Sequence, residues 1–338
     1  MLSYIIRRVL LMIPVLFGLS ILVFLMTASN PNGGAIASYL GGNTKTVTAS
    51  QLHAITVRLG LDKPLPVQYF VYIQHVLTGD LGNSFTQHIP VGDAIKIRIV
   101  PTLILLGTAF LLQELIAIPL GIFSAIRRGS VFDQFFSVIV YILFSIPTFW
   151  FGIMAILIFG VDLQWFPFGG MVNISKAGDD FGTPVWNMYL HTHTIAALTD
   201  LIQHLIMPAV VLAAVGIAGD SRYMRGQMLE VLSQDYVRTA KAKGLSQRLV
   251  IWKHALRNAI LPIVTNIGLQ LPGLIGGAVV TETIFAWPGM GNLFINAANH
   301  FDYPVVIGIV LMTGSLTLLF NLLTDLSYAV IDPRIRYT

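Results

Sequence analysis

Residues 101–126 read PTLILLGTAFLLQELIAIPLGIFSAI, and the only charged side chain in this run is Glu114. A hydrocarbon core about 30 Å thick is crossed by roughly 20 apolar residues in helical form, so this run could span a bilayer. Further stretches of the same kind are Val9–Met26, Phe135–Phe159, Leu201–Gly219, Ile260–Phe285 and Pro304–Ile331. The sequence therefore predicts an all-α, polytopic membrane protein with six transmembrane helices.

The composition favours the same class of protein. Apolar residues make up 55% of the chain and charged residues 11%, whereas soluble proteins average about 25% charged residues. The absence of cysteine excludes disulfides and thiolate metal sites. A net charge of +4 could suggest nucleic acid. The basic residues stand beside apolar spans instead, so we expect contact with membrane lipid and no nucleic-acid partner.

The positions of Lys and Arg predict the orientation. Basic residues flank the first, second and sixth spans and fill the segment after the fourth: Arg7, Arg8, Arg127, Arg128, Arg334, Arg336, Arg222, Arg225, Arg238, Lys241, Lys243, Arg248, Lys253 and Arg257. These are fourteen of the 20 basic residues. Cytoplasmic loops carry the excess of Lys and Arg, so both termini are expected in the cytoplasm. No A-x-A cleavage site follows Met26, and the first span is expected to be retained.

The spans divide the chain into three regions. We expect an N-terminal segment with the first span (1–29), an external loop region (30–98) and a five-helix core (99–338) containing a cytoplasmic loop, 222–258. A second external loop, Gly160–Asp200, is rich in aromatic residues. Such residues often mark the membrane–water interface, and docking of an external partner is an equally good interpretation.

The cytoplasmic loop is the most informative segment. A helical pattern, Gln227–Leu232, is broken by the capping-type residues Ser233-Gln234-Asp235. A short helix of small and basic residues follows and ends near Gly244, a residue suited to a left-handed C-cap. A second, basic helix is predicted over Gln247–Asn258. We expect a compact cytoplasmic knob held by two membrane helices; the alternative is a solvated basic loop.

The knob resembles the EAA loop of ABC-importer permeases, in the form found in the dipeptide/oligopeptide/nickel permease family. In that family the loop forms a coupling helix that docks on an ATPase subunit. The resemblance implies these coupling residues: Tyr236, Arg238, Thr239, Ala240, Lys241, Ala242, Gly244 and Leu245. Arg238 stands where the general motif has Glu, and this departure resembles the peptide branch.

Other segments extend the resemblance along nearly the whole chain. They are Leu59–Leu65 with Gly79–Ser84, Ile118–Gly121 with Arg127–Ser130, Ser145–Phe149, Glu282–Gly291 and Asp332–Tyr337. The family implies a type I ABC-importer permease fold in a bacterial or archaeal cytoplasmic membrane. It also implies a heterodimer with a second, related permease, an external substrate-binding protein, and two cytoplasmic ATPase subunits that bind ATP and Mg²⁺. This chain itself is expected to bind no cofactor and to be no enzyme.

The fifth span is the expected transport pathway. It contains Pro262 and Pro272 and several glycines, and such interrupted helices commonly line transport sites. Gly273 and Gly277 are four residues apart, which predicts a shared helix face for close packing. A tight helix contact without a channel role is the alternative.

Polar side chains within the spans supply further candidates. Ionisable residues in a bilayer are costly and default to functional hypotheses. We predict a pathway-facing group at Glu114, joined by Gln113 and Gln270; a carboxyl bonded to a neighbouring helix is the alternative. Glu282 is a further pathway candidate, and it adjoins an expected external gate.

The expected gate is the turn Trp287-Pro288-Gly289. No metal site is predicted, because His191 and His193 lack nearby acidic or sulfur ligands in the sequence.

The motifs that the sequence contains and lacks limit the remaining classes of function. The chain has no G-x-x-x-x-G-K-[ST] sequence, so it cannot bind ATP through a P-loop. An integral-membrane respiratory or enzyme subunit is an alternative that needs cofactor ligands inside the spans. A self-sufficient secondary transporter is another. Di- and oligopeptides are the leading cargo, with nickel and glutathione open.

Overall fold

The computed structural model describes residues 2–28, 49–58, 62–84, 86–177, 181, 183–274 and 276–331. Two segments of the family resemblance, residues 59–61 and 332–337, lie outside this part. The helices are α1 (Leu2–Ala28), α3 (Ala49–Arg58), α4 (Leu65–Leu77), α5 (Val91–Ile126), α6 (Val131–Ser145), α7 (Thr148–Ala155), η2 (Ile156–Asp162), α8 (Ile174–Ala177), α9 (Pro184–Thr192), α10 (Thr194–Leu232), α11 (Asp235–Ala242), α12 (Gln247–Leu249), η3 (Val250–Ala255), α13 (Leu256–Ala259), α14 (Leu261–Gln270), η4 (Leu271–Leu274), α15 (Val279–Ile284), α16 (Met290–Asn299) and α17 (Tyr303–Ile331). No strand occurs in the described residues, which confirms the all-helical class.

Four described helices are long and apolar enough to cross a membrane. They contain the segments Ile6–Leu25, Val91–Ile126, Thr194–Leu232 and Tyr303–Thr324, and they correspond to the predicted first, second, fourth and sixth spans. The fourth was predicted to end at Gly219, but α10 continues to Leu232. Polar residues from Asp220 onward therefore lie inside a helix and not in a loop.

The predicted third span is broken. Helix α6 and the α7–η2 segment meet at an angle of 99° and count as one crossing only if the bent pair is taken together. The break falls at Ile146, whose ψ of 124° is extended. Pro147 follows it, and a proline disfavours the α conformation in the residue before it. The span is thus two helices with a sharp bend.

The predicted fifth span is also interrupted, as its prolines and glycines indicated. It consists of α14, the 3-10 turn η4 and the short helix α15. The prediction that Gly273 and Gly277 share a helix face is wrong. Gly273 lies in the 3-10 turn and Gly277 has a φ of +81°, which lies outside helical geometry.

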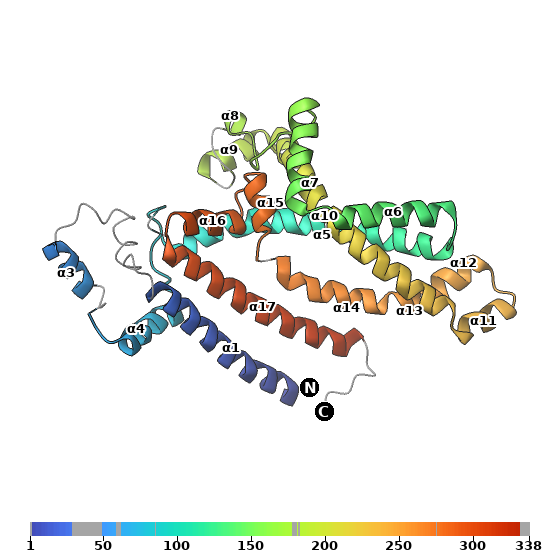
Figure 1. Cartoon of the computed structure of the whole chain (residues 1–338), viewed down its shortest axis with the longest axis horizontal. Helices are drawn as coiled ribbons and strands as arrows, with labels where there is room; N and C mark the ends of the chain where they lie inside the picture. Colours follow the sequence, from blue (N-terminus) through green and yellow to red (C-terminus); the bar gives the residue numbers. More distant parts are fainter. Residues whose placement is uncertain are drawn as a thin grey trace.

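The long helices pack as two pairs (Figure 1). Helices α5 and α10 form the largest helix–helix interface, and α1 runs antiparallel beside α17. At the first interface a Cβ on Gly121 would lie 2.6 Å from the Ser221 carbonyl oxygen, so the backbones are in close contact. The large apolar side chains of α1, such as Leu10 and Phe17, are exposed on the single chain. They suit contact with lipid or another subunit.

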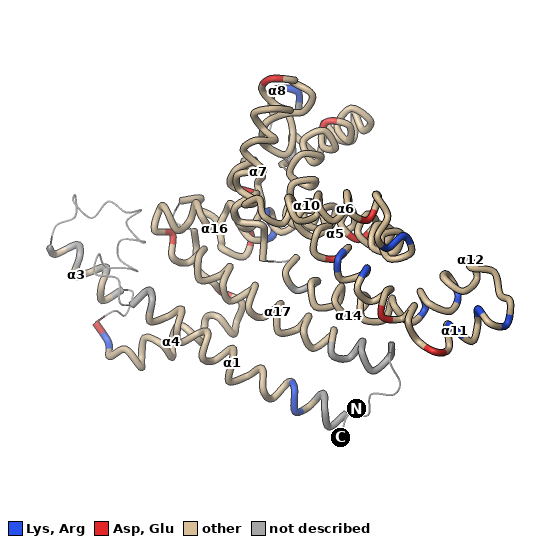
Figure 2. Tube along the Cα trace, turned by 45° about the vertical axis from the view of Figure 1, so that its right-hand side comes forward, with Lys and Arg blue, Asp and Glu red and all other residues tan. Residues whose placement is uncertain are grey.

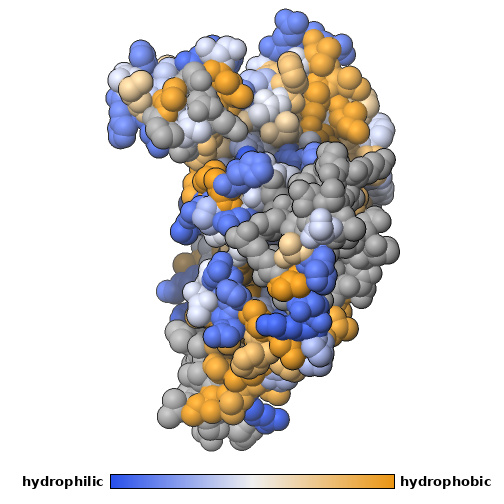
Figure 3. All heavy atoms as spheres, turned by 90° about the vertical axis from the view of Figure 1, so that its left-hand side faces the viewer, coloured by the Kyte–Doolittle hydropathy of each residue, from blue (hydrophilic) through white to orange (hydrophobic). Residues whose placement is uncertain are grey.

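The part of the molecule that carries α3 and α4 has a surface more mixed in polarity than that of α1. Viewed from the side on which α3 and α4 lie, hydrophilic and apolar residues are mixed (Figure 3). Such a mixture is typical of a surface in contact with water.

Candidate functional site

The loop that the sequence predicts to be a cytoplasmic knob folds as a helical hairpin. Helix α10 ends at Leu232, α11 begins at Asp235, and a turn at Gly244 leads into α12, η3 and α13. Gly244 has a φ of +76°, the left-handed conformation expected of it. We call residues 235–249 the knob.

The knob has an inner and an outer side. Val237 and Ala240 are buried against Val250, which lies in the returning helical segment. The Asn258 side chain donates a hydrogen bond of 2.7 Å to the Tyr236 hydroxyl. These contacts fix α11 onto the helices that continue into the bundle.

The outer side holds most of the predicted coupling residues. Exposed there are Tyr236, Arg238, Thr239, Lys241, Ala242, Gly244 and Leu245, whereas the predicted coupling residue Ala240 faces inward. The nearest carboxylate to Arg238 is that of Asp235, 3.4 Å away and itself exposed. An exposed pair of this kind contributes little, so the charge of Arg238 stays available. Figure 2 shows Lys and Arg gathered along α11 and α12.

Within the bundle, polar side chains from three helices form a cluster. Gln113 Nε2 on α5 donates to Asp220 Oδ2 on α10, at 2.5 Å, and to Gln270 Oε1 on α14, at 2.9 Å. Asn266 Nδ2 donates to Asp220 Oδ1 at 3.0 Å, and Gln270 Nε2 donates to Asp220 Oδ2 at 3.1 Å. Asp220 is thus held by three amide groups.

Glu114 belongs to the same cluster but has fewer partners. Its Oε1 accepts from Gln113 Nε2 at 3.2 Å, and its Oε2 is buried without a partner among the described residues. Gln113 Nε2 donates to the carboxyl groups of both Glu114 and Asp220, so the two groups share one donor. Neither carboxyl group forms a salt bridge with a basic residue in the described part of the chain. The structure brings together the three predicted residues Gln113, Glu114 and Gln270.

Two members of the cluster were not predicted. Asp220 was placed at the end of a span, although it continues the helix of an apolar segment. Asn266 precedes Gln270 by four residues, and this spacing puts both side chains on one face of α14. That spacing was visible in the sequence and could have identified Asn266.

Glu282, the fourth predicted pathway residue, lies apart from the cluster and is fully buried. Its Oε2 accepts from the backbone N–H groups of Gly291, at 2.7 Å, and Asn292, at 3.1 Å. Its Oε1 accepts from the Thr102 hydroxyl at 3.0 Å. The carboxylate therefore holds the first turn of α16 against α5.

The predicted gate turn lies in the same buried place. Trp287, Pro288 and Gly289 are all buried. The Trp287 Nε1 donates to the Pro101 carbonyl oxygen at 2.9 Å, and a Cβ on Gly289 would lie 2.5 Å from the Glu282 carboxylate. In the single chain this turn is a packed part of the core.

Comparisons with known proteins agree with the predicted resemblance. A family model described as "Binding-protein-dependent transport system inner membrane component" matches residues 117–337. A model of the N-terminal part of such membrane components matches residues 1–106. This chain belongs to that family. As an inner-membrane component of a transport system, it is not an enzyme of the respiratory kind considered above, and its location is the bacterial inner membrane.

Several relatives of this inner-membrane component are similar along their whole length. The oligopeptide transport system permease protein AppB of Bacillus subtilis is 39% identical over 338 residues, which cover 100% of both chains. The dipeptide transport system permease protein DppB of Escherichia coli K12 is 40% identical over 340 residues, covering 100% of this chain and 99% of the relative. The di/tripeptide transport system permease protein DppB of Pseudomonas aeruginosa is 39% identical over 341 residues, with the same coverage.

Proposed function

We propose that this chain is a transmembrane subunit of an ATP-driven importer that moves di- or oligopeptides across the cytoplasmic membrane. The observation that carries the proposal is about 40% identity along the complete chain to relatives named as peptide permeases. Its system would include a second, related permease and an external binding protein that delivers the peptide.

The proposed topology has six crossings with both termini in the cytoplasm. The bent pair α6–α7 would be the third crossing, and α14, η4 and α15 together the fifth. The start of α1 and the end of α17 lie at the same end of the molecule, which supports an even number of crossings (Figure 1). The gathering of basic residues in the knob supports its cytoplasmic position. Residues 99–338 would be the permease core, preceded by the external region 30–98 and the first span.

The proposed role of the knob is to dock on an ATPase subunit. Two such subunits would bind ATP and Mg²⁺, which this chain cannot do through a P-loop. The outer side of α11 is suited to docking because most of its side chains are small or basic and are exposed, whereas Val237 and Ala240 are packed. These packed contacts would transmit a displacement of the knob to α10 and η3, and the Tyr236–Asn258 hydrogen bond would transmit it to α13.

The proposed pathway passes the polar cluster. Gln113, Glu114 and Gln270 are supported as pathway groups by their position beside the break between α14 and α15, where backbone groups are freed from helical bonds. Glu282 and the turn Trp287-Pro288-Gly289 would frame the outer end as a fixed edge against which a gate closes.

The test is a reconstituted importer in which ATP hydrolysis is stimulated by peptide-loaded binding protein. Gly244→Asp places an acidic side chain on the basic outer side of the knob, at a residue with open space around its Cβ position. The φ of +76° strains any side chain at this position, but Asp is among the residues that can adopt the left-handed conformation. We expect the stimulation to be lost while the bundle stays folded, since the strain is confined to the turn of the knob.

The matched control is Glu230→Gln, a change at an exposed residue of α10 that precedes the knob. It should retain stimulation. Normal stimulation in Gly244→Asp would show that the knob does not couple the two subunits. Stimulation by a binding protein loaded with nickel, but not with peptide, would contradict the proposed substrate class.

A further inference from the structure

A polar cavity lies between α6 and α10, apart from the knob and from the polar cluster. It has a volume of about 220 Å³, and its polar lining consists of Ser137 and Tyr141 on α6 and Ser221, Arg222 and Arg225 on α10. The cavity therefore offers hydroxyl and guanidinium donors on facing helices and no carboxylate in its lining.

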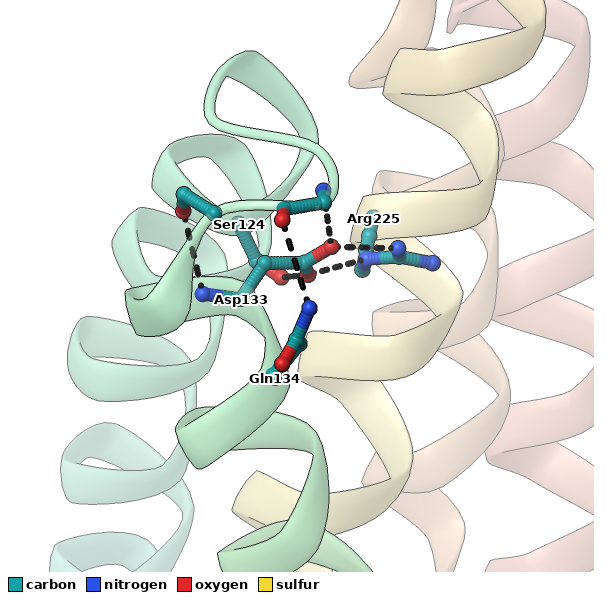
Figure 4. Close-up of polar contacts among 6 residues, drawn as sticks. Ser124, Asp133, Gln134 and Arg225 are labelled. Atoms are coloured by element: carbon teal, nitrogen blue, oxygen red, sulfur yellow. Dashed lines mark hydrogen bonds and ion pairs between the residues drawn. The ribbon is translucent and has the colours of Figure 1, made fainter.

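One of the two arginines is already paired. Arg225 Nε donates to Asp133 Oδ1 at 2.8 Å, and its Nη2 donates to Asp133 Oδ2 at 2.9 Å. Asp133 also accepts from the Ser124 hydroxyl and from the Gly129 N–H (Figure 4). This bidentate pair ties the α5–α6 turn to α10 and neutralises Arg225.

Arg222 is not paired in this way. Arg222 forms no ion pair with any of the described residues, and its side chain is exposed at the cavity. Its guanidinium carbon lies 5.0 Å from the ring centre of Phe144 and 5.7 Å from that of Tyr141. These rings orient the guanidinium by cation–π contact but leave its N–H groups available. The cavity thus has one uncompensated positive charge.

An apolar groove adjoins the cavity. It lies at the bend between α6 and α7, has a volume of about 540 Å³, and includes Ile142, Ile146, Pro147 and Trp150. Tyr141 lines both the groove and the cavity. Helix α6 begins after the basic loop that contains Arg127 and Arg128. The cavity and its polar donors lie nearer to this loop along the helix, and the apolar groove lies farther from the loop.

This order fits an amphipathic anion. We propose that the cavity and groove together bind an anionic phospholipid of the cytoplasmic leaflet, with its phosphate at Arg222 and Ser137 and an acyl chain along the groove. Basic pockets between membrane helices on the cytoplasmic side are suited to anionic headgroups. A soluble phosphate would use the donors but would leave the groove uncovered, so the groove favours a lipid.

The first test measures lipid retention on the complete, purified importer. Preparations in mixed phosphatidylglycerol and phosphatidylcholine are analysed by native mass spectrometry. Removing the guanidinium that lies in the cavity takes away one basic contact to the phosphate, which lowers the affinity for an anionic lipid about fivefold. Arg222→Gln should therefore retain about fivefold less phosphatidylglycerol. Arg128→Gln, which removes an exposed arginine of the α5–α6 loop outside the cavity, should retain the wild-type amount. Gel filtration and circular dichroism verify that both variants are folded.

The second test locates the acyl chain. Brominated chains quench nearby tryptophan, so brominated phosphatidylglycerol should quench the wild type more than the Trp150→Phe variant, and Arg222→Gln should lose that difference. Equal retention of phosphatidylglycerol by wild type, Arg222→Gln and Arg128→Gln would overturn the proposal. So would thermal protection by glycerol phosphate equal to that by the lipid, because it would identify a free-anion site.

Discussion

Gly216 of α10 leaves the space that the Gln113 side chain occupies. A Cβ at position 216 would lie 1.8 Å from Gln113 Oε1. Asp220 follows one helical turn later on the same face, so the glycine and the carboxylate together position the amide of Gln113. A single missing methyl group thus decides whether the polar cluster can form.

We expect Gly216→Ala to displace Gln113 and to break its hydrogen bonds with Asp220 and Gln270. Net hydrogen bonds in membrane proteins average about 0.6 kcal/mol and those to charged groups reach about 1.5–3 kcal/mol, so a loss of roughly 1–2 kcal/mol is expected. Thermal unfolding of the purified importer, followed by fluorescence, measures it.

Gly219→Ala is the matched control on the same helix, since a Cβ there would meet nothing within 4 Å. Replacing an unhindered helical glycine by alanine should stabilise the folded protein by up to about 1 kcal/mol. If both variants melt alike, Gln113 is not confined by position 216.

Among the elements, α5 and α10 carry the most extensive contact. Their closest approach is at Gly121, where a Cβ would lie 2.6 Å from the Ser221 carbonyl oxygen and 3.0 Å from the Arg225 backbone nitrogen. These are backbone atoms of a rigid helix, so they cannot move aside as a side chain would.

Gly121→Ala should therefore push the two helices apart. Overpacking of a close contact costs about 1–3 kcal/mol, and the melting temperature of the importer should fall accordingly. Gly107 is on the same helix, and a Cβ there would meet nothing within 4 Å. The control variant Gly107→Ala should therefore not lower the melting temperature. A similar loss in both variants would indicate that glycine flexibility in α5 matters, and not the contact.

The elements also show which parts of the structure could be predicted. Apolar length alone identified α1, α5, α10 and α17, because it reports directly on burial in lipid. It did not indicate that α6 and α7 meet at 99°, since Pro147 marks a break but not its angle. It also ended the fourth span too early, because hydropathy treats Asp220 as exposed while the amides around it supply its hydrogen bonds.

For the whole molecule, the proposed function requires that other subunits supply the energy. The chain lacks the phosphate-binding loop of an ATPase. Purified alone in nanodiscs, it should hydrolyse no ATP and should accumulate no peptide in response to an ion gradient. Adding the ATPase subunits should give hydrolysis that depends on an intact knob. Uptake by the isolated chain would contradict the proposed importer.

The polar cluster also has a consequence for how the chain enters the membrane. A ribosome completes α5, with Glu114, long before it has made Asp220 and the amides of α14. At about 5–20 residues per second the interval from position 114 to position 220 is several seconds. An acidic residue at the centre of an isolated helix costs about 2.5–3.5 kcal/mol on the insertion scale. We therefore expect helix α5 to remain bound at the translocon until α10 has been synthesised, so that the two helices enter the lipid as a pair.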